Sequence, residues 1–122
     1  MSNKMKYVED AMNSDVSVAI KYVHKFEEMM QNHLEKSFAS AVAGENEANM
    51  ILKKLKVDAT IYSIASDERF KQLENGALIL TDDETIAQNI KEQLKQETAF
   101  ILSPVLAAIG ISILEDTFAV SK

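Results

Sequence analysis

The chain has no cysteine, and its 122 residues include only three glycines and one proline. Without cysteine, the protein has no disulfide, no thiol nucleophile and no zinc site of the cysteine type. The glycines stand alone at positions 44, 76 and 110, so there is no glycine-rich phosphate loop, and no G-x-S-x-G nucleophile motif occurs. So few glycines and prolines predict long regular elements.

The sequence also lacks a hydrophobic run long enough for a membrane span, which needs about 20 apolar residues. The longest uncharged run covers residues 98–114, and Ser103, Pro104 and Gly110 interrupt it. The first ten residues contain lysines but no apolar core of a secretion signal. We therefore expect a soluble cytoplasmic protein without a membrane partner.

Basic residues are few, and the formal net charge is −6. Residues 1–66 carry eight lysines against nine acids, whereas residues 67–122 carry five basic residues against ten acids. The acidity is thus concentrated in the second half. Proteins that bind duplex DNA present a basic face, and here only Lys53, Lys54 and Lys56 cluster, as at a solvated helix end. We expect no nucleic-acid partner, whereas the acidity suits either solubility or capture of a basic protein.

The strongest pattern is an apolar seam in the first part of the chain. Its members are spaced 4, 3, 4, 3 and 4 residues apart, as in a heptad repeat. Ser14 or Asp15 is a candidate N-cap, and Gly44 a candidate C-terminal stop. The pattern predicts one helix of about 30 residues, about 45 Å long. The seam consists of Met12, Val16, Ala19, Val23, Phe26 and Met30.

A helix of that length exceeds what so small a domain can cover by itself. We therefore interpret the seam as an interface through which the chain self-associates, as a homodimer or a larger oligomer. Flexible methionines beside Phe26 suit such a surface.

The rest of the chain alternates between helix-like and strand-like segments. Helices are predicted over 45–55, 67–73 and 83–97, and strands over 59–64, 77–80 and 99–102. Strand, capped helix and strand over about 77–102 form a βαβ-like unit. Beyond Pro104 we expect a helix over 105–109 and one or two strands within 111–120.

These elements predict a single domain over residues 1–122, with a helical part (1–56) and an α/β part (57–122). The fold class is α+β or small α/β. The long N-terminal helix packs on, or projects from, a mixed sheet of three to five strands.

Candidate chemistry is limited to acidic side chains. Asp82 and Asp83 follow a buried strand, and with Asp58 they are candidates to hold Mg²⁺ or Mn²⁺. The simpler interpretation is that Thr81 or Asp82 caps a helix and that the acids in its first turn complement the helix dipole. The stretches MKYVEDAMN and ALILTDDETIA resemble the acidic strand ends of PIN-domain nucleases, which implies an acidic set of Asp10, Glu45 or Glu47, Asp58 and Asp82. However, Asp10 precedes a helix rather than ending a strand.

The two histidines, His24 and His33, are nine residues apart and do not form a metal pair. The leading hypothesis is a non-enzymatic interaction module without cofactor that binds itself, with another protein as a further candidate partner. Examples are an inhibitor, immunity-like, assembly or phage accessory protein. The alternatives are a Mg²⁺- or Mn²⁺-dependent hydrolase or nuclease, and a sensor with a small-ligand pocket at the strand ends.

Overall fold

The computed structural model describes the backbone of residues 4–71, 73 and 76–120, and the side chains of these residues except 4, 16–18 and 117–120. In this part of the chain, five α-helices and a three-stranded antiparallel sheet confirm the α+β class. The elements are α1 (Lys4–Asn13), α2 (Val16–Leu34), β1 (Phe38–Val42), α3 (Glu45–Leu55), β2 (Thr60–Ser63), the 3₁₀ helices η1 (Ile64–Ser66) and η2 (Glu68–Phe70), β3 (Ala77–Thr81), α4 (Glu84–Gln96), η3 (Thr98–Phe100) and α5 (Pro104–Val120).

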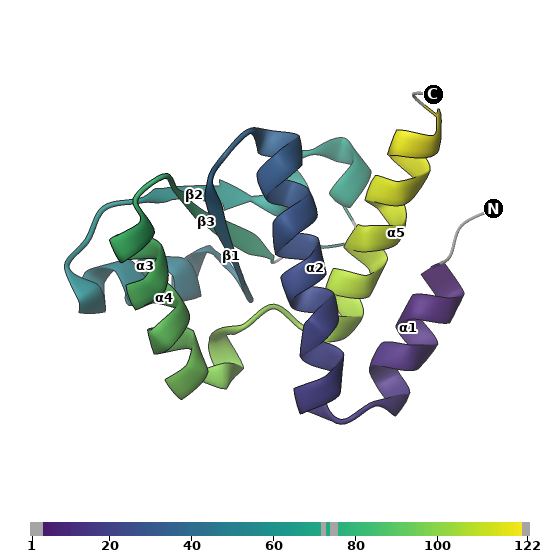
Figure 1. Cartoon of the computed structure of the whole chain (residues 1–122), viewed down its shortest axis with the longest axis horizontal. Helices are drawn as coiled ribbons and strands as arrows, with labels where there is room; N and C mark the ends of the chain where they lie inside the picture. Colours follow the sequence, from purple (N-terminus) through teal and green to yellow (C-terminus); the bar gives the residue numbers. More distant parts are fainter. Residues whose placement is uncertain (1–3, 72, 74–75, 121–122) are drawn as a thin grey trace.

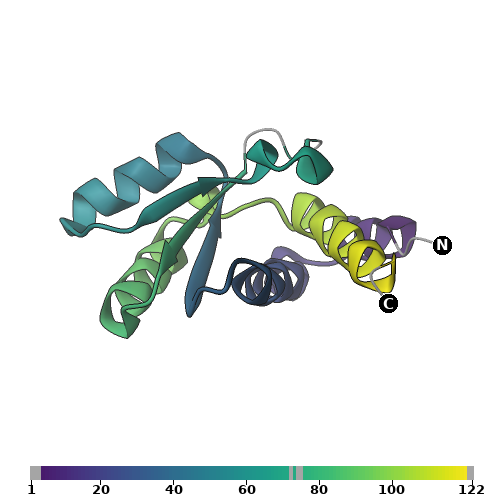
Figure 2. The same ribbon diagram turned by 90° about the horizontal axis from the view of Figure 1, so that it is seen from above.

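The sheet has the strand order β1-β3-β2 and lies between two layers of helices (Figures 1 and 2). Helices α3 and α4 cover one face, α2 and α5 cover the other, and α1 packs outside against α5. Successive side chains of the central strand β3 point to opposite faces. Leu78 and Leu80 join the cluster under α2 and α5, whereas Ala77 and Ile79 join the cluster under α3 and α4. The continuous apolar run of β3 is thus buried on both faces, as the sequence predicted.

The predicted 30-residue helix is wrong at its C-terminal end. α2 starts after Asp15, as expected, but it ends at Leu34, and Glu35 takes the left-handed conformation with φ 56°. The next segment forms β1, which pairs antiparallel with β3. The apolar residues Leu34, Phe38, Ala41 and Val42 fit a continued helix, but residues 38–42 form a strand instead. Tertiary pairing decides between helix and strand, because β3 needs a partner on each side for its backbone groups.

Two predictions for the end of the chain are also wrong. Residues 99–102 do not form a strand, because 98–100 make the turn η3 and Ile101 makes one isolated bridge with Val42. Residues 111–120 continue the helix that begins at Pro104. Apolar residues occupy most positions of α5, with Ser112, Glu115, Asp116 and Thr117 as the polar exceptions in 111–120, and the helix is packed against α1, α2 and η2. Such a helix lacks the one-sided period by which an amphipathic helix is identified.

The helix predicted over 45–55 and the strands over 59–64 and 77–80 are confirmed. The helix predicted over 67–73 is only a 3₁₀ turn at Glu68–Phe70, capped by Asp67; residues 72, 74 and 75 lie outside the described part. Every helix in the described ranges is too short or too polar to cross a lipid bilayer.

Candidate functional site

The seam proposed as an interface lies largely inside the chain itself. Val23, Phe26 and Met30 are at most 1% exposed, and Ala19 is 2% exposed. They face the core in which α2 packs against α5. Met12, on α1, is the exception with 67% exposure. The side chain of Val16 lies outside the described residues.

The candidate metal ligands are engaged in local structure. Asp83 is the N-cap of α4, since its side chain accepts a hydrogen bond from the Ile86 amide at 3.1 Å. Asp82 accepts from the Ser37 amide at 2.9 Å and lies 3.8 Å from Lys36. The Ser37 amide holds the pKa of Asp82 below its usual value. The cap interpretation of the acidic cluster fits these contacts, but the capping residue is Asp83 and not Thr81 or Asp82 as predicted.

Asp58 and Asp10 belong to other surroundings. Asp58 lies in a hollow between α3 and β2. Asp10 accepts a hydrogen bond from the Tyr22 hydroxyl and lies 3.3 Å from Lys21, and these partners lower its pKa. Burial, and then the Asp10 carboxylate, raise the pKa of Tyr22 to about 12. Among the described side chains, no group of three or more His, Asp or Glu is arranged to hold a metal ion.

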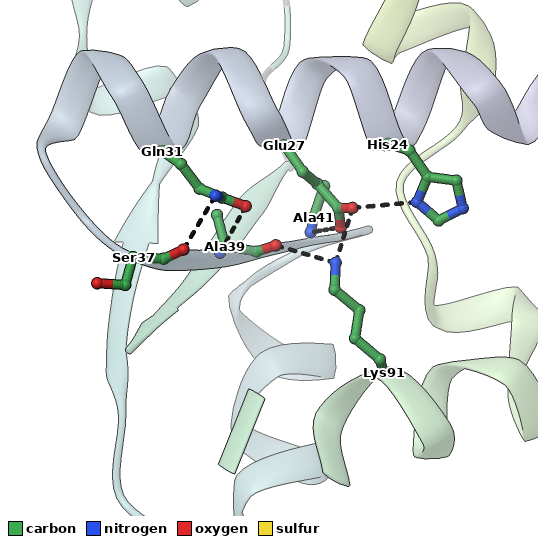
Figure 3. A network of polar contacts seen from close by, with 7 residues as sticks. All are labelled: His24, Glu27, Gln31, Ser37, Ala39, Ala41 and Lys91. Atoms are coloured by element: carbon green, nitrogen blue, oxygen red, sulfur yellow. Dashed lines mark hydrogen bonds and ion pairs between the residues drawn. The ribbon is translucent and has the colours of Figure 1, made fainter. Parts of the chain in front are cut away.

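A row of polar side chains connects α2 to the outer edge of β1 (Figure 3). The backbone N–H and C=O groups of the even-numbered residues of β1 point toward β3. Those of the odd-numbered residues therefore point outward, away from the sheet. The Gln31 amide donates to the Ser37 carbonyl at 3.0 Å and accepts from the Ala39 N–H at 3.3 Å. Glu27 accepts from the Ala41 N–H at 2.6 Å. These side chains take the place of a fourth strand.

The remaining outward groups of β1 have partners as well. The Ala39 carbonyl accepts from the Lys91 ammonium at 3.0 Å. The Ala41 carbonyl accepts from the Leu102 amide at 3.3 Å, and the Ala43 amide donates to the Phe100 carbonyl at 2.8 Å. The edge is therefore closed to pairing with another chain.

Glu27 is the central group of this network. It is only 4% exposed, and its carboxylate lies 2.7 Å from the Lys91 ammonium of α4 and 3.4 Å from the His24 ring. Buried carboxylates are retained as ions only when paired and hydrogen-bonded, and here the Ala41 amide and the Lys91 ammonium supply both. The pair also fixes α2 to α4 across the end of β1 (Figure 3).

A cavity of about 430 Å³ lies beside this ion pair, between α2 and α4. Its apolar wall comes from side chains of both helices together with β1 and the segment after η3. Its polar groups are Glu27, Lys91, His24, Lys95 and Thr98. The apolar wall consists of Ile20, Val23, Ala41, Leu94 and Ile101.

Exposed basic side chains lie at the opening of this cavity. The side chains of His24 and Lys95 are 65% and 75% exposed, whereas that of Lys91 is 36% exposed. Glu27, the one acid in the lining, is already neutralised by Lys91. Lys95 also lies 3.4 Å from Glu92, an exposed pair that water screens strongly. A bound anion would therefore meet attraction rather than repulsion at the rim.

Sequence reasoning missed Glu27 and Lys91. The available signal was weak: His24, Glu27 and Gln31 form a polar row at helical spacing directly beside the apolar seam. Nothing in the sequence connects that row to Lys91, which is 64 residues away from Glu27. Comparison of the chain with protein-family models, with curated proteins and with solved structures found no match.

Proposed function

We propose that this protein is a binding module for a small amphipathic acid, a molecule with an apolar body and one anionic headgroup. The observation that carries the proposal is the cavity of about 430 Å³ beside the buried Glu27–Lys91 pair. Its volume lies in the range of about 300–1,000 Å³ that is usual for small-molecule sites. Apolar walls with a few convergent polar groups are the usual composition of such sites.

The position of the charges supports a single orientation of the ligand. The apolar body would lie against Leu94 and Ile101, because desolvation of apolar surface is the main source of affinity there. The headgroup would lie at the rim beside Lys95 and His24, where it stays partly hydrated. Lys91 is less available because Glu27 and the Ala39 carbonyl already occupy two of its three N–H donors.

The test is a titration of the isotope-labelled full chain with octanoate, followed by amide NMR and calorimetry. We expect saturable binding with shifts on the cavity-facing sides of α2 and α4, and weaker binding of octanol and octylamine. Thr98→Phe, at the exposed rim, should fill the opening and reduce affinity at least tenfold, about 1.4 kcal/mol. Thr85→Phe, an exposed α4 position outside the cavity, is the matched control. Absence of saturable binding for all three probes at millimolar concentration would refute the proposal.

Self-association remains a second candidate, carried by one observation. Met5 and Met12 are both 67% exposed and lie seven residues apart on one side of α1. Exposed methionines suit adaptable protein contacts. We expect sedimentation at tens of micromolar to show a dimer or larger species, and Met5→Glu with Met12→Glu to shift it toward monomer. Met50→Glu, at an exposed methionine of α3, is the control. A monomer throughout would contradict this candidate.

A further inference from the structure

The free edge of the sheet is β2, and it differs from the closed edge of β1. The Ile64 amide donates to the Gly76 carbonyl at 3.0 Å. In an antiparallel pair every second residue bonds to the neighbouring strand, so the even-numbered residues of β2 are the ones that bond to β3. Ile61 and Ser63 therefore turn their backbone groups away from β3. The Ser63 carbonyl accepts from the Ser66 hydroxyl at 2.6 Å. The described residues provide no partner for the other outward groups, namely the two amides and the Ile61 carbonyl.

A hollow of about 440 Å³ lies beside this edge, between α3 and β2. Its apolar part includes Leu52, Ala59 and Ile61, which pack on the cluster under α3 and α4. Lys53 and Lys56 line it from α3 and its C-cap, and both are exposed. Neither lysine forms an ion pair with any described residue, and Asp58 is the one acid in the lining. The hollow thus carries excess positive charge on a chain whose net charge is −6.

We propose that β2 is a docking edge for an extended acidic segment of a partner protein. The segment would add as a fourth strand, with its backbone bonded to Ile61 and Ser63. Its acidic side chains would face Lys53 and Lys56. Main-chain hydrogen bonds supply affinity in this mode of recognition, and side-chain pockets supply specificity.

The charges favour such a segment over a second copy of this chain. Antiparallel pairing of β2 with its own copy requires a twofold axis perpendicular to the sheet. That axis places both α3 helices on the same face, so the Lys53 and Lys56 groups of the two copies would approach each other. Like charges in that position are repulsive, whereas an acidic strand neutralises them.

The probe is a capped heptapeptide of alternating glutamate and threonine, titrated into the full chain and followed by amide NMR. The comparison peptide carries lysine in place of glutamate. We expect saturable shifts in β2 and α3 with the acidic peptide only. Lys53→Glu with Lys56→Glu should weaken binding at least tenfold, whereas Lys6→Glu on α1, at the other end of the molecule (Figure 1), should not.

Ser63→Pro tests the backbone contact. Ser63 has φ −76°, which proline adopts without strain, and its amide faces away from β3, so the variant removes an outward donor and leaves the pairing with β3 intact. We expect loss of peptide binding in Ser63→Pro and retention in Ser63→Ala. If Ser63→Pro fails to fold, the lysine double variant, which alters exposed residues alone, decides the question.

Five outcomes would overturn the proposal. They are no saturable binding of the acidic peptide at millimolar concentration, equal binding of the lysine peptide, and unchanged binding in the lysine double variant. The fourth is a stronger response to single-stranded oligothymidylate, which would assign the lysines to nucleic acid. A dimer that Ser63→Pro dissociates would likewise show that the occupant is a second copy.

Discussion

Replacing Glu27 with alanine should destabilise the chain by about 2–3 kcal/mol, a large fraction of the roughly 5–15 kcal/mol that a domain of this size possesses. The carboxylate accepts from the Ala41 amide at 2.6 Å and lies 2.7 Å from Lys91. Its removal leaves a buried amide without an acceptor, and such a group costs about 1–3 kcal/mol. The Lys91 side chain is 36% exposed, so water would recover part of its lost interaction. The measurement is urea unfolding at 25 °C.

Two further variants separate the charge from the hydrogen bond. Glu27→Gln keeps an acceptor for the Ala41 amide, so it should cost about half as much as Glu27→Ala. Lys91→Met keeps the apolar stem but leaves the carboxylate without its cation. The double variant Glu27→Gln with Lys91→Met should lose less stability than the sum of the single variants, because removal of both charges leaves neither unpaired. Additivity within error would mean that the two groups do not interact.

Glu27→Ala should also reopen the edge of β1. The Ala41 amide, protected by the carboxylate in the native chain, should exchange with solvent faster in the variant. A strand edge with unpaired backbone groups is a template for pairing with another chain. We therefore expect Glu27→Ala to aggregate at lower concentration than Glu27→Gln. Equal exchange of the Ala41 amide in both variants would contradict the assignment of Glu27 as its acceptor.

The elements that the sequence predicted correctly are those marked by a local signal, such as a helix cap or a continuous apolar run. The acids at the start of α4 supplied its cap, and Asp83 performs that role through its bond to the Ile86 amide. The run from Ala77 to Leu80 predicted a strand buried on both faces, and it is central in the sheet. These features depend on residues within one turn or one strand, so a single sequence contains the necessary information.

The errors concern segments whose structure depends on distant partners. β1 follows a stripe that fits a continued helix, and it is a strand because β3, about 40 residues later, pairs with it. The candidate cavity could not be predicted for the same reason. The pair beside it joins Glu27 on α2 to Lys91 on α4, and these residues meet only in the folded chain. The heptad seam was detected correctly as an apolar surface. Its cover is α5, of which the sequence predicted only the part over 105–109 as a helix.

Replacing Gly110 with alanine should destabilise the chain by about 1–3 kcal/mol, although alanine is the better helix former by about 1 kcal/mol. Gly110 of α5 lies directly against the ring of Phe26 on α2. An added β-carbon would lie 2.4 Å from Cε1 of Phe26 and 2.8 Å from its Cδ1. Phe26 is fully buried and packs edge-on against Phe70, with ring centroids 6.3 Å apart. The ring therefore has no space into which to move.

Thermal unfolding of three variants tests this contact. Phe26→Leu alone should be destabilising because it leaves a cavity. Combined with Gly110→Ala, it should cost less than the sum, since the methyl group then occupies space that the ring has vacated. The stability difference between Asn89→Ala and Asn89→Gly, at an exposed position of α4, supplies the helix-propensity contribution alone. Subtracting it isolates the steric cost at Gly110.

The result also bears on the seam. Phe26 was expected to face another copy of the chain, whereas here Gly110 of α5 lies against it. If α5 covers the seam in solution, the steric cost at Gly110 must appear at every protein concentration, because the contact is intramolecular. If Gly110→Ala instead follows helix propensity and stabilises the chain, α5 does not pack on Phe26. The seam would then be available to a partner, and the interface predicted from the heptad pattern would regain its basis.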